Sequence, residues 1–202
     1  MPVKGAGGHR QRQAEATKVE VARAARALFA ERGYVATTIT AISGAADIPV
    51  QTIYSAFGTK AAILDKITET WMAEAETVTL AKASLRSSAP ADRLRMLAEL
   101  NRRQLQLGLD IIAIYQEAAG SDPRMAQTLR NILAAREREI RRLIRTLGPA
   151  LKPGLSEDRA LDVTLALTLH DLYRTLVVER GWSPRRYETW LGATLGEQLL
   201  TH

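Results

Sequence analysis

The chain has 202 residues, with 28 basic against 22 acidic residues and no cysteine. A hydrophobic content of 46% excludes a disordered chain and allows a sizeable core. Without cysteine, disulfides and thiolate metal sites are excluded. No apolar run approaches the roughly 18 residues of a membrane span, and residues 1–13 lack the apolar segment of a secretion signal. We therefore expect a cytoplasmic protein with no membrane partner.

Basic charge is concentrated near the N-terminus. Residues 1–66 hold nine basic against five acidic residues, which is +4 of the total charge of +6. This distribution and a pI of about 9.9 fit a partner with a phosphate backbone, although a solvated basic surface is an ordinary alternative. The residues Lys4, His9, Arg10 and Arg12 belong to a predicted basic arm, which either enters a minor groove or frays.

Two short periodic segments, 38–46 and 50–57, flank the tight junction Asp47-Ile48-Pro49. Two helices joined by so short a turn predict a helix-turn-helix unit. Apolar residues at spacings of three and four should face inward: Ile39, Ile42, Ala46, Ile48, Ile53 and Phe57. A further helix is predicted from Thr59, whose hydroxyl can cap it.

The outer face of this unit carries the side chains expected to contact DNA. On the second helix these are Val50, Gln51, Thr52, Tyr54 and Ser55. Glutamine can pair with adenine through two hydrogen bonds, and threonine or valine can touch a thymine methyl group. Thr38, Tyr54 and Lys60 offer donors for phosphates. Because similar hairpins occur in proteins that never meet DNA, the motif alone leaves both interpretations open.

The surrounding sequence strengthens the DNA-binding interpretation. Its features are Val21-Ala22-Arg23-Ala24-Ala25-Arg26-Ala27-Leu28-Phe29, Glu31, Gly33-Tyr34, Thr37-Thr38-Ile39, Ile42, Ala46 and the stretch from Thr52 to Lys60. Over about residues 17–64 this pattern resembles the DNA-binding domain of the tetracycline-repressor (TetR) family of transcriptional regulators. The chain departs from that pattern at Ser43, usually a small apolar residue, at Asp47, usually glycine, and at Pro49, usually a capping serine or threonine. These departures affect where the second helix starts and how it tilts.

Beyond Lys60 the chain is predicted to be helical almost throughout. The segment 61–85 contains no glycine or proline and is long enough, as one rigid rod, to link two domains and transmit a tilt. Further helices are expected at 91–109, 111–119 and 124–147, with Asp122 as a cap and Pro123 in the first helical position. The alternating charges of 124–147 indicate a solvated face more readily than a nucleic-acid site.

The last two predicted helices carry leucine-rich stripes. Packing within one chain would explain these stripes, but two such helices also suit a two-fold four-helix interface. The resemblance implies that interface, and it implies that the middle helices enclose a pocket for a small inducer. The candidate dimer residues are Leu165, Leu169, Leu172, Leu176, Tyr187, Leu191 and Leu195.

Candidates for an effector pocket are aromatic, amide and ionisable residues of the helical region. They are Trp71, Asn101, Gln104, Tyr115, Gln116, Glu117, His170 and Tyr173. The same residue types fill ordinary helix interfaces, and a satisfied, partly buried histidine explains His170 more simply than a ligand does. We find no catalytic constellation, metal-ligand spacing or cofactor motif.

We therefore predict an all-α protein with a basic arm (1–16), a three-helix DNA-binding domain with a helix-turn-helix (17–60) and a helical effector-binding and dimerisation domain (61–202). The resemblance implies a homodimeric repressor that binds a palindromic DNA operator and is released by a small-molecule inducer, without a cofactor. Two alternatives stay open. One is an architectural DNA-binding protein without an effector, and the other is a helical small-molecule-binding protein or enzyme.

Overall fold

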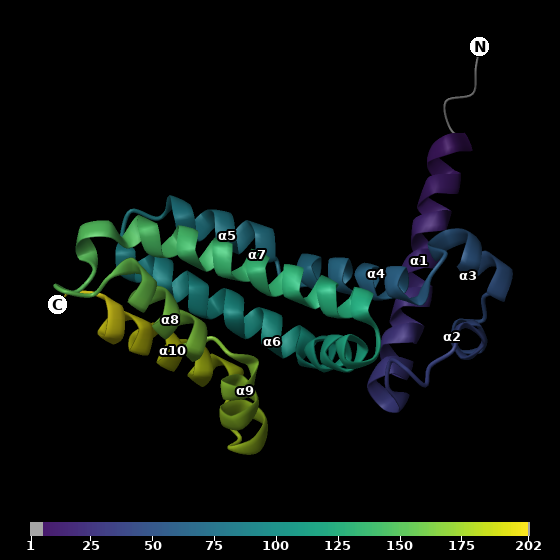
Figure 1. The fold of residues 1–202 in the computed structure, drawn as a ribbon. Helices are drawn as coiled ribbons and strands as arrows, with labels where there is room; N and C mark the ends of the chain where they lie inside the picture. The colour runs from purple at the N-terminus through teal and green to yellow at the C-terminus, as the bar shows by residue number, and fades with distance from the viewer. Residues whose placement is uncertain (1–5, 202) are drawn as a thin grey trace, which may run out of the picture. The chain divides into compact units, whose positions relative to one another are not determined.

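The computed structural model describes residues 6–201, which are helical over most of their length (Figure 1). The helices are α1 (Ala6–Arg32), α2 (Ile39–Ala46), α3 (Val50–Phe57), α4 (Lys60–Glu74), α5 (Thr77–Arg86), α6 (Pro90–Ser121), α7 (Pro123–Leu147), α8 (Glu157–Leu167), α9 (His170–Tyr173) and α10 (Pro184–Leu199). A 3₁₀ turn, η1 (Gly148–Ala150), and a π-helical segment, η2 (Arg174–Glu179), complete the order. The predicted all-α fold is confirmed. Among the described residues no helix has both the length and the apolarity to cross a membrane.

The chain forms two compact units whose limits differ from the predicted domain boundary. The first unit contains the residues up to 71 together with 110–129, and the second contains 72–109 together with the residues from 130 onward. The prediction places all residues beyond 60 in a second domain. The structure instead places 61–71 and 110–129 in the unit that contains the helix-turn-helix. Helices α4, α6 and α7 each contribute residues to both units.

The core of the first unit is formed by the inner faces of α1, α2, α3 and α4, together with buried residues from the end of α6 and the start of α7. Ile42 and Ile53 are fully buried, and Ile39, Ala46, Ile48 and Phe57 pack against the same cluster, so the predicted inward face is confirmed. The rings of Tyr34 and Phe29 pack at a tilt of 54° with their centroids 5.1 Å apart. Burying each large side chain contributes about 1.5–3 kcal/mol. Truncating such a residue to alanine costs about 2–5 kcal/mol of stability, so Ile53→Ala alone should strongly destabilise this unit.

In the second unit α10 packs against α8 and against the first half of α6. A side chain at Gly192 would meet Arg95 and Ala98 at 3.5–3.7 Å, so the backbones approach closely there. Three of the residues predicted for the dimer interface have no exposed surface: Tyr187, Leu191 and Leu195. This is a correction, because they lie in the core of their own chain and cannot touch a second copy.

Several helix starts follow the predicted capping chemistry. Thr59 accepts the N–H of Ala62 at 3.1 Å before α4. Asp122 accepts the N–H of Arg124 at 2.8 Å, with Pro123 as the first residue of α7. Hydroxyl oxygens of Ser156 and Ser183 cap α8 and α10 in the same way. Each cap satisfies a backbone donor that would otherwise have no partner in the helix.

The predicted rod over 61–85 is wrong. Helix α4 ends at Glu74, and Glu76 has a left-handed backbone (φ 53°) before α5 begins. No glycine or proline marks this break. The left-handed Glu76 pairs with Arg103 of α6, which also pairs with Glu99.

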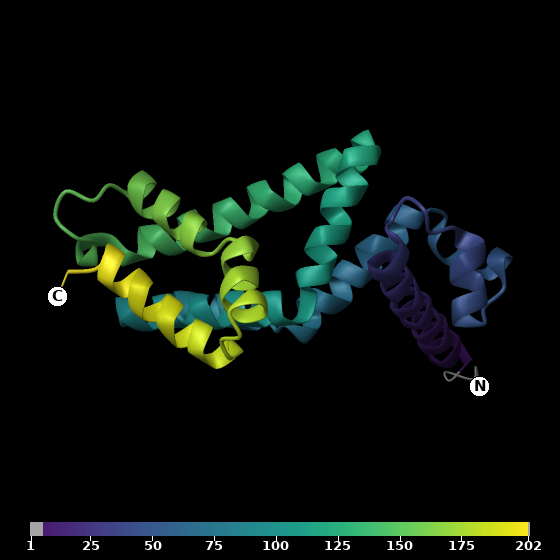
Figure 2. The same ribbon diagram turned by 90° about the horizontal axis from the view of Figure 1, so that it is seen from below.

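The predicted break between the segments 91–109 and 111–119 is found at Gly108, whose non-helical backbone (φ −146°, ψ 25°) divides α6 into two helical stretches at a kink (Figure 2). The predicted stripe from Leu161 to Leu176 is interrupted at Leu169, whose extended backbone (φ −65°, ψ 143°) separates α8 from α9.

Candidate nucleic-acid interface

The turn between α2 and α3 is held by backbone and side-chain hydrogen bonds. Asp47 has a left-handed backbone (φ 53°, ψ 40°), as its position predicted, and its N–H bonds to the carbonyl of Ser43. The Ser43 hydroxyl donates to the carbonyl of Ile48 at 2.7 Å. Pro49 precedes α3 without a side-chain cap, while its carbonyl accepts from Thr52 and Ile53 at 2.9 and 3.1 Å. Thus the serine that departs from the usual pattern closes the turn and fixes the start of α3.

Helix α3 presents a polar outer face. Gln51, Thr52, Tyr54 and Ser55 are exposed, whereas Ile53 between them is buried. Val50 is half-buried at the start of the helix. The exposed side chains are therefore available for contact with a major groove, and their roles in reading bases stay predictions.

Thr38 serves first as the cap of α2. Its hydroxyl oxygen accepts the N–H of Ala41 at 3.1 Å. The residue is exposed, so the hydroxyl proton is still available to a phosphate. A phosphate contact by Thr38 is thus compatible with its capping bond.

Lys60 has partners other than the phosphate expected for it. Its ammonium donates to the carbonyls of Tyr34 and Thr37 at 2.5 and 3.0 Å, with a longer contact to the carbonyl of Val35 at 3.4 Å. It also lies 4.3 Å from the centre of the Tyr34 ring. Burial lowers the pKa of Lys60, and the charge of Glu117 opposes this shift. Lys60 therefore stabilises the loop between α1 and α2, and a phosphate would have to compete with these carbonyls.

The same loop is held from the other side by Glu117 of α6. The carboxylate accepts the N–H groups of Tyr34 and Val35 at 3.0 and 3.2 Å. Gly33 has φ 84°, and a Cβ atom there would lie 2.5 Å from Glu117 Oε1. Glu117, predicted as a pocket residue, is instead a support of the DNA-binding unit.

A second carboxylate of α6 binds α1. Asp110 accepts two hydrogen bonds from the guanidinium of Arg26, each 2.7 Å long. A cleft of about 410 Å³ lies nearby in the same unit, lined by Tyr34, Val35, Thr59, Lys60, Ala61, Ser121, Asp122 and Arg124. Sequence reasoning missed Asp110 and Arg124, because the chain gives no local signal for contacts between residues so far apart.

The eight residues predicted for an effector pocket do not form one set. Four belong to the first unit: Trp71, Tyr115, Gln116 and Glu117. Of these, Trp71 packs against the core of that unit, Tyr115 is buried with its hydroxyl 2.9 Å from that of Thr68, and Gln116 is exposed. The other four belong to the second unit: Asn101, Gln104, His170 and Tyr173.

Within the second unit a buried polar group joins some of these candidates. Asn101 donates to the carbonyl of Thr168 at 3.1 Å and accepts from the hydroxyl of Tyr187 at 2.8 Å. The rings of Tyr187 and Tyr173 meet edge to face at 4.9 Å. His170 lies half-buried with Nε2 3.7 Å from a carboxylate oxygen of Asp171, while Gln104 donates to the Thr77 hydroxyl at 3.2 Å.

The remaining dimer candidates differ in exposure. Leu169 is exposed, and Leu165, Leu172 and Leu176 are half-buried. These four residues, unlike the three buried on α10, are open to a second copy.

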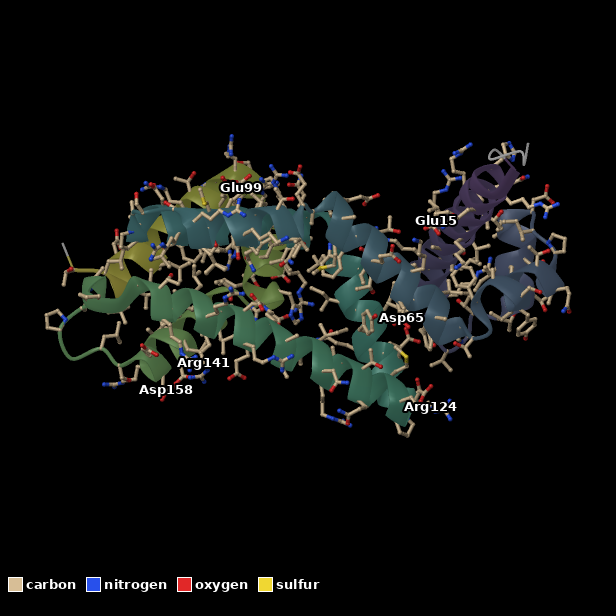
Figure 3. All side chains as sticks on the ribbon, turned by 90° about the horizontal axis from the view of Figure 1, so that it is seen from above. Glu15, Asp65, Glu99, Arg124, Arg141 and Asp158 are labelled. Atoms are coloured by element: carbon tan, nitrogen blue, oxygen red, sulfur yellow. The ribbon has the colours of Figure 1, made fainter. Side chains whose placement is uncertain are left out.

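The predicted arm over 1–16 is partly corrected, because residues 6–16 are the first turns of α1. His9, Arg10 and Arg12 are exposed on that helix, and Lys4 lies outside the described residues. Further along α1, Glu15, which is labelled in Figure 3, pairs with Lys66 of α4. Among the described residues no cluster of three or more histidine or acidic side chains is placed to hold a metal ion.

Comparison with known proteins places the sequence features in context. Residues 21–67 match the model of the bacterial regulatory proteins of the tetR family. No curated protein matches the sequence.

Solved structures of transcriptional regulators share the fold at low identity. A putative regulator from Saccharomonospora viridis in complex with choline is 18% identical over 93% of this chain and 100% of its own, with a TM-score of 0.70. A regulator from Aquifex aeolicus VF5 is 16% identical over 90% of this chain and 98% of its own, also with a TM-score of 0.70. NalD of Pseudomonas aeruginosa, the secondary repressor of a multidrug efflux pump, is 22% identical over 93% and 98%, with a TM-score of 0.67.

Proposed function

Since the chain belongs to the tetR family of bacterial regulatory proteins, we propose that it is a repressor which binds a palindromic operator as a homodimer and is released by a small molecule. As a member of that family it is a DNA-binding transcriptional regulator and not an enzyme. Its proposed place of action is the cytoplasm, where bacterial DNA lies.

The observation that carries the proposal is the outer face of α3. Gln51, Thr52, Tyr54 and Ser55 are exposed on a helix whose opposite side is anchored by Ile53. A rigid helix with several polar side chains on its free face suits a major groove, which is wide enough to admit it. Gln51 reads adenine, and Val50, Thr52 and Ser55 contribute the other base contacts.

Contacts to phosphates position this helix. Thr38 and Tyr54 are exposed at its edges and carry hydroxyl groups. Such contacts raise the affinity for all sequences alike and carry no sequence information. Lys60 contributes by holding the loop that precedes α2.

A two-fold dimer supplies a second copy of α3, which can bind the other half of the operator. Leu169, exposed where α8 gives way to α9, and the half-buried Leu165, Leu172 and Leu176 are the proposed contact residues. Operator symmetry then reflects protein symmetry, with recognition helices about 34–36 Å apart, one turn of B-DNA.

Control by a small molecule is the third part of the proposal. The Saccharomonospora viridis regulator was solved with choline, which supports a ligand in the helical region of this chain as well. By linkage, an inducer that weakens DNA binding must itself bind more weakly to the DNA-bound protein. Its differential affinity sets the largest effect that it can have.

Selection from a pool of random DNA duplexes with the purified full chain tests the proposal. We expect enrichment of an inverted repeat and an affinity roughly 10³-fold or more above that for a scrambled duplex at physiological salt. Transcription in vitro from a promoter that carries the selected repeat should fall when the protein is added.

Equal binding of all duplexes would favour an architectural DNA-binding protein without an effector, which is the second candidate. No binding to any duplex, or a selected sequence without two-fold symmetry, would contradict the proposal.

A further inference from the structure

Arg136 on α7 is a cation without a carboxylate partner. Its Nη2 donates to the carbonyl of Thr168 at 2.9 Å and to the hydroxyl of the same residue at 2.5 Å, and these acceptors are neutral. Arg141 of the same helix differs, because it pairs with Glu137 and Asp158; Figure 3 labels Arg141 and Asp158. The charge of Arg136 is therefore not compensated by any described acidic side chain.

Part of the Arg136 guanidinium is open to a ligand. Its Nε and Nη1 have no hydrogen-bond partner among the described residues. No described side-chain nitrogen is both fully buried and unbonded, so these donors reach solvent. Burial of the rest of the group lowers the pKa of Arg136, as expected for a desolvated charge without a counter-ion.

The surroundings of Arg136 are fixed by a buried hydrogen-bond network. The Thr168 carbonyl that Arg136 binds also accepts from Asn101, which in turn accepts from Tyr187. Burial raises the pKa of Tyr187 strongly, so this phenol is neutral and brings no negative charge. Because its partner Thr168 is held from two sides, Arg136 is pre-organised and loses little freedom on binding an anion.

Exposed apolar side chains flank the guanidinium. Ile132 and Leu133 are 37% and 53% exposed and precede Arg136 by one turn of α7, on the same side of the helix. One cation with large apolar neighbours complements a small molecule that has one negative charge and a hydrophobic body.

We propose that Arg136 binds the carboxylate of an amphipathic monocarboxylate, whose apolar part rests on Ile132 and Leu133. The guanidinium would donate one charge-assisted hydrogen bond to the carboxylate through Nε or Nη1, since both planar forks of an arginine include Nη2, which already donates to Thr168. A phosphate monoester, with a charge near −2, would leave negative charge unpaired at this single cation. The inference rests on the proposed function, since it names the chemical class of the regulating ligand.

Calorimetric titration of the full chain with octanoate tests the site, and 1-octanol serves as the uncharged ligand of equal chain length. Benzoate and laurate are added as monocarboxylates of different size. The variant Arg136→Gln keeps a donor for Thr168 and removes the charge, while Arg136→Lys keeps the charge and removes the planar guanidinium. Arg141→Gln is the matched control, since it alters another arginine of α7 that already has carboxylate partners.

We expect a monocarboxylate to bind wild type at one site per chain, roughly tenfold or more tightly than 1-octanol. Arg136→Gln should lose about the same factor, Arg136→Lys should lose less, and Arg141→Gln should bind as wild type does. Circular dichroism must show equal helix content in all four proteins.

Equal affinity for octanoate and 1-octanol would overturn the proposal. So would equal losses in Arg136→Gln and Arg141→Gln, or no binding of any of the three carboxylates at about 1 mM. If instead Arg136→Gln alone changed the oligomeric state in light scattering while no carboxylate bound, the counter-ion would be a second copy and the proposal would be wrong.

The DNA experiment separates this inference from the proposed function. Carboxylate binding is measured without DNA, so failure of the DNA selection leaves its result intact. If a carboxylate binds at Arg136 but leaves operator affinity unchanged, its role as the effector is overturned while repression stands.

Discussion

The ammonium of Lys60 lies beneath the loop between α1 and α2 and donates to the carbonyls of Tyr34 and Thr37. Charge-assisted hydrogen bonds contribute about 1.5–3 kcal/mol each where they are made. A lysine that holds backbone in this way affects DNA binding through the shape of the domain. Its effect on the salt dependence of binding should be correspondingly small.

We predict that Lys60→Met lowers the free energy of unfolding by about 2 kcal/mol, measured by urea denaturation, and changes the salt slope of DNA binding by less than the roughly one unit of a phosphate contact. Arg23→Ala is the control, since both Arg23 and its partner Glu20 are exposed and such pairs contribute about 0–1 kcal/mol. If the salt slope of DNA binding fell by a full unit while stability stayed unchanged, Lys60 would contact a phosphate and this prediction would be wrong.

Asp47 occupies the left-handed position of the turn between α2 and α3. Glycine takes this backbone without the steric cost that a Cβ atom brings. We predict that Asp47→Gly is more stable than Asp47→Ala by about 1 kcal/mol in urea denaturation, with the same preferred operator. Equal stability of the two variants would show that the turn carries no strain.

At the scale of elements, the helix-turn-helix could be predicted closely because local chemistry sets its limits. Thr38 and Thr59 cap helices, Asp47 and Pro49 shape the turn, and apolar spacing selects the buried face. The break after Glu74 could not be predicted, since no glycine or proline marks it and Glu76 meets Arg103 of a later helix. The mechanism that needs a single rod over 61–85 therefore does not fit this structure.

Helix α6 reaches the DNA-binding unit through two carboxylates, Asp110 on Arg26 and Glu117 on the loop after α1. Both contacts lie beyond the bend at Gly108. A shift of this part of α6 would act on the loop that leads into α2. A substitution at Gly33 can test how closely Glu117 approaches this loop.

We predict that Gly33→Ala costs about 2 kcal/mol or more of stability, because the residue has φ 84° and its new methyl group would meet Glu117. In a Glu117→Ala background the cost should fall but not vanish, since the backbone strain persists. Urea denaturation of the four proteins gives the coupling between the two sites. If the losses of stability from Gly33→Ala and Glu117→Ala were additive, the Glu117 carboxylate would not lie against residue 33, and the prediction would be wrong.

For the whole molecule, the stripes of leucine predicted interfaces without telling inner from outer ones. Tyr187, Leu191 and Leu195 complete the core of one chain, whereas Leu169 is exposed. An amphipathic pattern records which face is buried, and it does not record which helix covers that face. For the same reason the sequence could not show that the eight candidates for an effector pocket are divided between two units.

We predict that Leu169→Arg, alone or with Leu172→Arg, converts a dimer into monomers in light scattering at micromolar concentration, because a charge at the centre of an apolar interface is left unpaired. Val78→Arg is the control, since that side chain is also largely exposed in the second unit but lies outside the proposed interface. Dimers that persist in the leucine variants, or a wild-type chain that is monomeric, would contradict this arrangement.

The central claim is that the exposed face of α3 reads DNA sequence. The most direct test measures the affinity of wild type and Gln51→Ala for the selected operator and for all its single base-pair variants, by fluorescence anisotropy. We predict that Gln51→Ala loses about 1–3 kcal/mol of discrimination at one base pair in each half-site and keeps the wild-type preference at the others. An unchanged preference at every position, or an equal loss at all of them, would contradict the claim.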